Sequence, residues 1–242
     1  MVTTALPQAW PRPSHPRPIV LVGAGSIARA AHLPAYRRLD FEVAGVYDVN
    51  PPAAARTARE FGIPRVFATL EEACAARGVV FDLAIPGDAT LGVLARLPEG
   101  AAVLMQKPMG GSLDEARRIL RCVRSRRLVA AVNLQLRFSP GMLALQEWIR
   151  REQSGPLVDI DVRVVIDQPW GSWPFLERAG RLELPYHSIH YLDAIRGIAG
   201  EPSGVWCRAI RHPGLPALQD TRSTIILGFG DRMIRCSLVL NH

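Results

Sequence analysis

The sequence predicts an α/β fold, in which a doubly wound parallel sheet is followed by an α+β domain with an open, mainly antiparallel sheet. Short, continuously apolar runs alternate with helical stretches in the first half, and a glycine-rich turn follows the first run. Such runs are typical of strands that are buried on both faces of a parallel sheet. After about residue 135 apolar and polar residues alternate instead, which indicates a sheet with one solvated face. We expect a flexible tail at 1–18, a first domain at 19–134 and a second domain at 135–242.

The composition is that of a globular protein. The 242 residues are 48% hydrophobic and 21% charged, with a net charge of +7, and a chain of this size can bury a core without disulfides or metal ions. The four cysteines are far apart in the sequence, which is typical of buried thiols in a reducing compartment. Neither a membrane-spanning apolar run nor a signal-peptide pattern is present. We therefore expect a soluble, cytoplasmic protein that does not bind membranes.

The first domain is expected to alternate strands and helices. Its strands are expected at five apolar runs: 19–22, 43–47, 82–85, 101–105 and 128–132. Among the helices between them, residues 52–61 start at prolines and end at Gly62, and residues 112–127 begin with Ser112 three residues before Glu115, which is a capping box. Strand–helix–strand alternation implies right-handed βαβ units, and hence a doubly wound sheet.

The second of these helices is rich in arginine. Six arginines crowd it: Arg117, Arg118, Arg121, Arg124, Arg126 and Arg127. A basic helix can bind a phosphate backbone, but it can equally present a solvated face. An apolar stripe of Ala116, Ile119, Leu120 and Val123 favours the solvated face. We therefore expect no specific nucleic-acid partner.

The second domain is expected to combine helices with an open sheet. Helices are predicted at 140–152 and 186–199. Residues 158–166 alternate apolar and polar side chains, which predicts an antiparallel strand with one solvated face. Further strands are expected at 205–210, 223–229 and 233–240, the last two joined at Gly230-Asp231 as a hairpin.

The glycine-rich turn after the first strand fits the dinucleotide-binding fingerprint GxGxxA. Gly23 allows a tight turn, Gly25 lets the backbone approach a pyrophosphate, and the small Ala28 lets the following helix pack closely on the strand. The main chain of Ser26 and Ile27, where that helix begins, would direct N–H groups at the phosphates. The sequence therefore predicts a Rossmann-type domain.

Asp48 ends the second strand, 20 residues after Ala28. An acidic side chain at this place accepts hydrogen bonds from the ribose hydroxyls and repels a 2′-phosphate, which favours NAD over NADP. Arg56 is near in the sequence, so NADP stays an alternative. We expect a domain that binds NAD.

The sequence resembles the glucose–fructose oxidoreductase / inositol dehydrogenase / MocA (Gfo/Idh/MocA) family, and four motifs in the same order carry the likeness. They are Ala31-His32-Leu33-Pro34-Ala35 after the fingerprint, Ile85-Pro86 at a strand end, Met105-Gln106-Lys107-Pro108, which is similar to the family's Glu-Lys-Pro motif, and His190-Tyr191-Leu192-Asp193, which is similar to its His-x-x-Asp helix. The resemblance implies that Pro86, Gln106 and Lys107 contact the cofactor.

Three residues depart from the family pattern. Gln106 replaces a glutamate, which keeps hydrogen bonding but loses a charge, and Thr90 stands where many members carry a histidine. Tyr186, four residues before His190, takes the place of the usual catalytic aspartate. The resemblance also implies a longer chain, so we expect the C-terminal domain to be incomplete.

Lys107 is the only lysine in the chain, and it directly follows the strand and glutamine at 101–106. In a doubly wound sheet the carboxyl ends of the strands form the ligand crevice. A lysine there can donate a hydrogen bond to the reacting oxygen, and its charge stabilises an alkoxide as it develops. We expect Lys107 to be catalytic and to contact both cofactor and substrate.

His190 is the expected general base. Tyr186 and His187 precede it by four and three residues, which places all three on one helix face. An unperturbed imidazole titrates near pH 6.5, which suits removal of a hydroxyl proton near neutrality. Two histidines are too few to hold zinc, so no metal is expected. Asp193 and Arg196 could pair at i, i+3, and we expect them to be structural.

Further substrate contacts are expected from side chains close to these motifs. Trp170 and Trp173 lie in a Pro-rich loop before the helix, and Asn133 and Arg137 follow the strand at 128–132. Aromatic faces in a cleft can stack on a sugar ring. His187 is expected to contribute a further polar contact.

The expected function is NAD(P)-dependent transfer of a hydride between nicotinamide and a carbinol carbon. By resemblance, the substrate is a sugar, sugar acid or cyclitol, and the C-terminal sheet forms a homo-oligomer. Two alternatives stay open: an NAD-using glycoside hydrolase of the same superfamily, and a non-catalytic NAD-binding regulatory or interaction protein.

Overall fold

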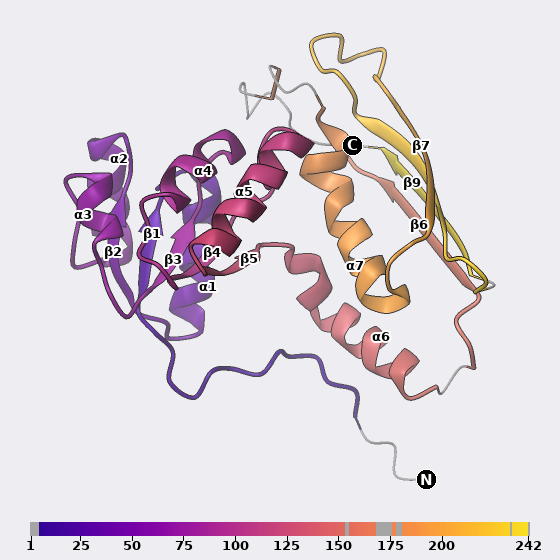
Figure 1. Cartoon of the computed structure of the whole chain (residues 1–242), viewed down its shortest axis with the longest axis horizontal. Helices are drawn as coiled ribbons and strands as arrows, with labels where there is room; N and C mark the ends of the chain where they lie inside the picture. The colour runs from indigo at the N-terminus through magenta and orange to yellow at the C-terminus, as the bar shows by residue number, and fades with distance from the viewer. Residues whose placement is uncertain (1–4, 153–154, 168–175, 178–180, 233, 242) are drawn as a thin grey trace. The chain divides into compact units, whose positions relative to one another are not determined.

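The computed structural model describes the chain at residues 5–152, 155–167, 176–177, 181–232 and 234–241. The chain divides into two compact units (Figure 1). The first unit is Arg12–Asn133, and the second unit is Met1–Pro11 together with Leu134–His242. Within the second unit the ring of Trp10 lies edge-on to that of Phe138, with centroids 5.0 Å apart, so part of the expected tail contacts this unit.

The first unit is built on a five-stranded parallel sheet in the order β2-β1-β3-β4-β5. Its strands are β1 (Ile19–Val22), β2 (Val43–Tyr47), β3 (Val80–Leu83), β4 (Ala102–Met105) and β5 (Val129–Val132). They coincide with the five apolar runs, and the predicted doubly wound parallel sheet is confirmed. Only β3 is displaced by two residues, because Pro86 has no N–H to donate and begins the turn into the next helix.

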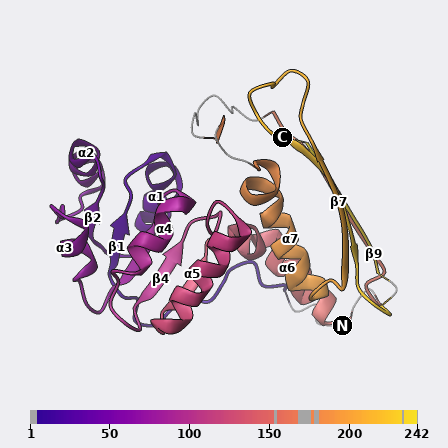
Figure 2. The same ribbon diagram turned by 45° about the horizontal axis from the view of Figure 1, so that its top comes forward.

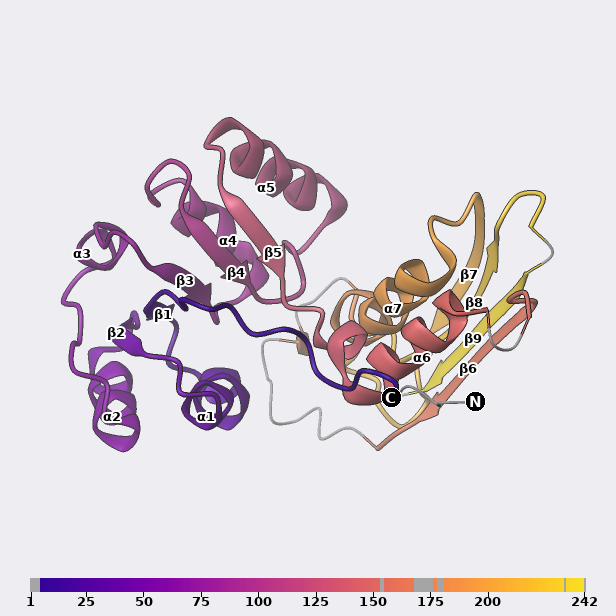
Figure 3. The ribbon, with the colours of Figure 1, turned by 90° about the horizontal axis from the view of Figure 1, so that it is seen from below.

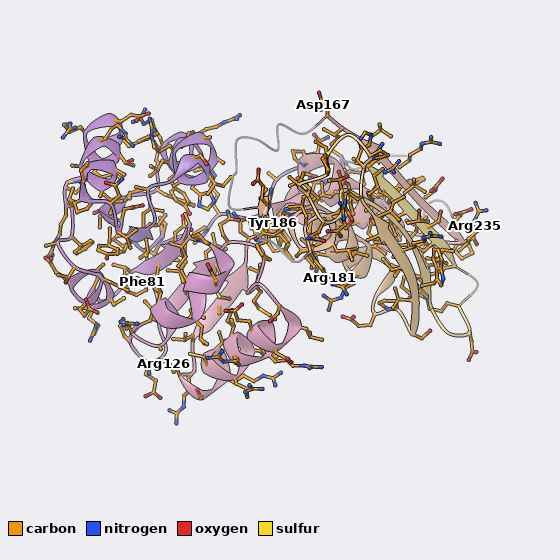
Figure 4. The ribbon with its side chains drawn as sticks, turned by 90° about the horizontal axis from the view of Figure 1, so that it is seen from above. Phe81, Arg126, Asp167, Arg181, Tyr186 and Arg235 are labelled. Atoms are coloured by element: carbon orange, nitrogen blue, oxygen red, sulfur yellow. The ribbon has the colours of Figure 1, made fainter. Side chains whose placement is uncertain are left out.

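Helices cover both faces of this sheet (Figure 3). One layer consists of α3 (Leu70–Cys74), α4 (Gly87–Leu94) and α5 (Leu113–Ser125), and its core includes Phe81, which is labelled in Figure 4 and is 1% exposed. The other layer consists of the π-helical segment η1 (Ala28–His32), α1 (Leu33–Arg38) and α2 (Pro51–Phe61). It packs on the opposite side of β1 and β2, against Leu21 and Val46.

Helix α5 begins as its capping box predicts. The hydroxyl of Ser112 accepts a hydrogen bond from the N–H of Glu115 at 3.2 Å, and the carboxylate of Glu115 accepts one from Gly111 at 2.7 Å. The predicted apolar stripe is only partly correct, because Ile119 is fully buried whereas Leu120 is 41% exposed. Cys122 packs against the core instead.

The second unit contains a four-stranded sheet in the order β6-β9-β8-β7. Its strands are β6 (Asp159–Val165), β7 (Gly204–Ile210), β8 (Arg222–Gly228) and β9 (Arg235–Asn241). Two of its three pairings are antiparallel, as expected, but β6 and β9 run parallel, so the predicted antiparallel direction of this strand is wrong. The alternation of apolar and polar residues in β6 indicates only that one face of the strand is solvated. Whether β6 runs parallel or antiparallel depends on its partner strand β9, some seventy residues later in the chain.

One face of this sheet is covered by α7 (Ile189–Ala199), which Figures 1 and 2 show beside it. Ile195 packs there against Ile225 and Leu238. A 3₁₀ turn, η2 (Gln135–Phe138), and α6 (Pro140–Arg150) both contact α7, and they also contact each other. The predicted helix at 186–199 is not regular throughout, since a π-helical segment, η5 (Leu184–Ser188), precedes α7. In the described ranges, none of the helices has the length and apolarity needed to cross a membrane.

Candidate active site

The glycine loop leaves β1 at the place where the strand order of the parallel sheet reverses. β1 lies between β2 and β3, and such a switch point is where doubly wound sheets bind ligands. Gly23 has φ +101, and a Cβ added to it would stand 2.4 Å from the carbonyl oxygen of Ala84. No other residue fits this turn without displacing the neighbouring strand.

The outer side of the loop is open. Gly25, Ser26 and Ile27 are exposed, and a Cβ added at Gly25 would meet nothing within 4 Å. Ala28 is fully buried, as the small third residue of the fingerprint requires. The loop thus presents its main chain to a ligand while its inner residue packs on the sheet.

Asp48 is attached to this loop. One carboxylate oxygen, Oδ2, accepts a hydrogen bond from the N–H of Ala24 at 2.7 Å, and Oδ1 accepts one from the N–H of Asn50 at 2.8 Å. An open glycine cradle beside a carboxylate at the end of β2 fits the pyrophosphate and ribose of a dinucleotide. Arg56 lies exposed on α2.

Lys107 lies at the carboxyl end of β4, on the same edge of the sheet as the glycine loop. Its side chain is half-buried, and burial lowers the pKa of the ammonium group below the ordinary lysine value. Its peptide bond to Pro108 is cis. A Cβ added at Gly87, the first residue of α4, would stand 2.8 Å from the carbonyl oxygen of Pro108, so the loops that carry Pro86 and Lys107 are in close contact.

A cluster of buried and partly buried polar side chains is joined by a hydrogen bond to the main chain of Lys107, and sequence reasoning missed its role. We call it the His32 cluster; its members are His32, Tyr36, Asp82, Gln106 and Asn133. Its hydrogen bonds join five elements in sequence: η1, α1, β3 and the ends of β4 and β5. The available signal was Asp82, a charged residue inside an otherwise apolar strand.

Three of the contacts within the His32 cluster are short. His32 Nδ1 lies 2.6 Å from Asp82 Oδ2, and the Tyr36 hydroxyl donates to the same oxygen at 2.8 Å. Gln106 Nε2 lies 2.6 Å from His32 Nε2, and the amide of Asn133 lies 3.4 Å from it. His32 is 6% and Asp82 1% exposed. Burial, with the neighbouring Asp82, raises the pKa of the Tyr36 phenol above its ordinary range.

The other predicted catalytic residues belong to the second unit. Tyr186 and His187 lie in the π-helical segment η5, and His190 lies in the first turn of α7. A π-helix bonds each residue to the fifth one along, so the α-helical spacing used to place these three side chains on one face does not hold through this segment. Tyr186, labelled in Figure 4, packs against the buried Leu182 and Leu218.

The charged residues of α7 pair differently from the prediction. Asp193 accepts two side-chain hydrogen bonds from Arg137, each 2.8 Å long, and its carbonyl oxygen accepts a third at 2.6 Å. Arg196 pairs instead with Glu201, beyond the end of the helix. The expected i, i+3 pair between Asp193 and Arg196 is therefore wrong, because each has a partner outside the helix.

The structure thus brings the predicted cofactor residues together on one edge of the first unit. Gly23, Gly25, Ser26, Ile27, Asp48, Pro86, Gln106, Lys107 and Asn133 all follow the carboxyl ends of its strands. Arg137, Tyr186, His187 and His190 belong to the second unit. Trp170 and Trp173 lie outside the described residues. Within the described residues, no group of three or more potential ligands could hold a metal ion.

Comparison with known proteins identifies the first unit. Residues 17–134 match the family model described as "Oxidoreductase family, NAD-binding Rossmann fold". A search of curated proteins gave no match.

Solved structures show the same fold along nearly the whole chain. A structure from Sinorhizobium meliloti assigned to a myo-inositol dehydrogenase is 23% identical, with a TM-score of 0.79 over 93% of this chain and 69% of that chain. A levoglucosan dehydrogenase in complex with NADH and levoglucosan is 21% identical, with a TM-score of 0.80 over 94% and 67%. The WlbA dehydrogenase from Bordetella pertussis, in complex with NADH and UDP-GlcNAcA, is 18% identical, with a TM-score of 0.79 over 94% and 70%.

The glycine loop, the carboxylate that binds it, the lysine at the end of β4 and the match over residues 17–134 agree with one another. The dinucleotide-binding domain at residues 17–134, slightly less than half of the chain, therefore matches the Gfo/Idh/MocA oxidoreductase family with its NAD-binding Rossmann fold.

Proposed function

We propose that this oxidoreductase acts on a carbinol carbon of a small polyhydroxylated molecule: a sugar, sugar acid or cyclitol. The observation that carries the proposal is the position of Lys107, half-buried at the strand edge that also holds the glycine loop and Asp48. A desolvated cation at this edge suits an oxygen that becomes negative during the reaction. The levoglucosan and UDP-GlcNAcA complexes of the similar structures support a sugar-like substrate.

The cofactor would be held by the first unit. The main chain of Gly23, Gly25, Ser26 and Ile27 would bind the pyrophosphate, and Asp48 would bind the ribose; Pro86, Gln106 and Lys107 would lie beside the nicotinamide. When bound, NAD supplies the acceptor for a hydride. The carboxylate of Asp48 favours NAD, and the exposed Arg56 leaves NADP as a weaker alternative.

Lys107 and His190 would have different roles toward the substrate hydroxyl. His190 takes the proton from the hydroxyl, and Lys107 stabilises the negative charge that is left on the oxygen. Tyr186 donates a further hydrogen bond to this oxygen. The charge of Lys107 acts more strongly here than in water, because its surroundings have a lower dielectric constant.

The remaining substrate contacts would come from His187, Asn133, Trp170, Trp173 and Arg137. The Nε and Nη2 groups of Arg137 already bind Asp193, so its contact with substrate would use the N–H groups of Nη1. Arg137 would therefore link the substrate to α7, the helix that carries His190.

The test is a panel of sugars, sugar acids and cyclitols incubated with the protein and NAD, with NADH absorbance as the readout. We expect NADH to accumulate with one class of substrate. Lys107→Ala should keep its affinity for NAD but lose about 10²–10³ in kcat, whereas Ser125→Ala, a change of the exposed last residue of α5, should change neither. Glycoside cleavage without net NADH would contradict the proposal in favour of a hydrolase. Tight NAD binding with no turnover would favour a non-catalytic protein.

We also propose that the protein is a cytoplasmic homo-oligomer. The sheet face that α7 does not cover carries exposed apolar side chains, among them Trp206 at 54% and Val239 at 42%. They border a surface groove of about 320 Å³, which Arg163, Arg208 and Arg222 also line. Exposed apolar side chains that are rimmed by polar residues often mark protein interfaces. The four cysteines are free thiols, which supports a reducing compartment.

A further inference from the structure

The protonation of the His32 cluster follows from its geometry. The N–H of Lys107 can only donate, so the Gln106 atom that faces it at 3.1 Å must be the carbonyl oxygen Oε1. The amide nitrogen of Gln106 then faces His32 Nε2, which must accept its hydrogen bond and carries no proton. The imidazole proton therefore lies on Nδ1 and is donated to Asp82.

Each member of this chain of hydrogen bonds fixes the next. Asp82 Oδ2 accepts from both His32 and Tyr36. The phenol stays protonated because burial and Asp82 raise its pKa. The resulting tautomer of His32 selects one orientation of the Gln106 amide, and that amide accepts the main-chain hydrogen bond of Lys107.

Burying such a polar cluster costs free energy that an apolar core would not. A buried carboxylate loses its hydration, and Asp82 Oδ1 has no hydrogen-bond partner in the described part of the chain. Well-packed apolar side chains of similar volume often stabilise a fold as well or better. The cluster therefore requires a reason beyond stability, and it ends at the main chain of the one lysine in the chain.

We infer that His32 is a positioning residue for Lys107: with its Nδ1 proton held by Asp82, it orients the amide of Gln106, which fixes the main chain from which the Lys107 side chain extends. The inference rests on the proposed catalytic role of Lys107. Asp82 from β3 and Tyr36 from α1 are the titratable groups that contact His32 among the described residues, and Gln106 and Asn133 add neutral amides.

Because Lys107 is the only lysine, the test can observe it directly. Protein grown with lysine labelled with carbon-13 at Cε gives one side-chain signal, which we expect to be narrow and to titrate in one step. Gln106→Met has a similar length but makes neither hydrogen bond. It should broaden or split this signal and move its titration midpoint toward the ordinary lysine value, near 10.4.

Gln106→Glu tests the tautomer. A carboxylate can accept from the N–H of Lys107 but cannot donate to His32, so the pair at positions 106 and 32 needs one proton more than the native pair. As the pH rises this proton is lost and the contact breaks. The Lys107 signal of this variant should therefore show a second titration step, which the wild type and Gln106→Met lack.

Kinetics with the substrate found in the panel provide the second readout. Gln106→Met should lower kcat about tenfold and affect KM less, because the transition-state contact of Lys107 is disturbed. Compared with the wild type at the same pH, Gln106→Glu should recover most of this loss as the pH is lowered. The same melting temperature in all variants would show that the fold is intact.

The control is Thr57→Val, a change of a buried polar residue on α2, outside the cluster. It should leave the Lys107 signal and kcat unchanged. If Thr57→Val changed them as much as the Gln106 variants do, the inference would be overturned, because any loss of buried polar contacts in the domain would then have the same effect. An unchanged Lys107 signal in both Gln106 variants would also overturn it. If no substrate is found, the proposed function fails, but the labelled signal still decides whether the cluster positions Lys107.

Discussion

Asp48 binds the glycine loop through its own carboxylate. Oδ2 accepts the N–H of Ala24 at 2.7 Å, so the group that would recognise the ribose also holds the loop in place. The carboxylate therefore helps to shape the cradle, and in the proposed function it would also determine cofactor choice. The same residue was identifiable in the sequence from its distance to the fingerprint, but its contact with the loop was not.

We predict that Asp48→Ala weakens NAD binding about tenfold or more, as expected for the loss of hydrogen bonds to a charged group. The rejection of NADP should relax, because the repulsion of a 2′-phosphate disappears. The dissociation constants of both cofactors, measured by titration calorimetry, test this. Asp48→Asn is the control, since it retains hydrogen bonding and loses only the charge. Unchanged NAD affinity in Asp48→Ala would show that the carboxylate does not touch the ribose.

Lys107 should give the reaction an alkaline limb. Burial lowers the pKa of its ammonium group, and the protonated form is the active one. As the pH rises through this lowered pKa, the charge is lost. The decrease in kcat should therefore begin at a pH below the ordinary lysine pKa, which is near 10.4. Lys107→Arg should abolish the limb, because a guanidinium stays charged, although its different shape lowers kcat. A limb at the same pH in Lys107→Arg would mean that another group titrates.

At the scale of elements, the sequence predicts what local patterns determine. The five apolar runs became the five parallel strands, and the capping box begins α5 at the expected residue. The direction of β6 was not predictable from its alternation, because its partner β9 lies far along the chain. Likewise, the π-helical turns at Leu184–Ser188 have no pattern of their own, since the residues also fit a regular helix.

The helical segment η5 and α7 carry Tyr186 and His190, and the roles proposed for these two residues can be separated by experiment. His190→Ala should lose most of the turnover, together with the acid limb of kcat/KM, because the imidazole acts as a base only when it is unprotonated. Tyr186→Phe should keep this limb and lose a smaller factor, because only a hydrogen-bond donor is removed. pH profiles of both variants test this. If Tyr186→Phe abolished the limb, the two roles would be reversed; if neither change affected turnover, these helical turns would be structural.

At the scale of the whole molecule, the predicted site residues come from both units of the chain. The fingerprint, Asp48 and Lys107 could be placed from sequence because all follow strands of one sheet. The His32 cluster could not, because it joins residues up to 101 positions apart, whose neighbourhood only the fold creates. The pairing of Arg137 with Asp193 is of the same kind, linking residues 56 positions apart.

The uncovered face of the second sheet leads to a prediction for the assembled protein. Two of its exposed apolar residues, Trp206 and Ile226, lie opposite each other on β7 and β8, whereas Val239 on β9 lies opposite Arg163 on β6. Arg235, labelled in Figure 4, binds Asp159 on the same sheet. Burial of such a face by a second copy would remove apolar area from water, which stabilises the complex by roughly 25 cal/mol per Å² before the costs of association.

We therefore expect light scattering to show an oligomer in solution, and Val239→Glu to shift it toward the monomer. A charge placed in the middle of a buried interface must lose its hydration, which opposes association. Leu120→Glu is the matched control, because it introduces the same charge at an exposed apolar residue of α5, in the other unit, and should leave the mass unchanged. Circular dichroism would verify that both variants fold. A monomeric wild type, or an oligomer that Val239→Glu does not weaken, would show that this face is not the interface.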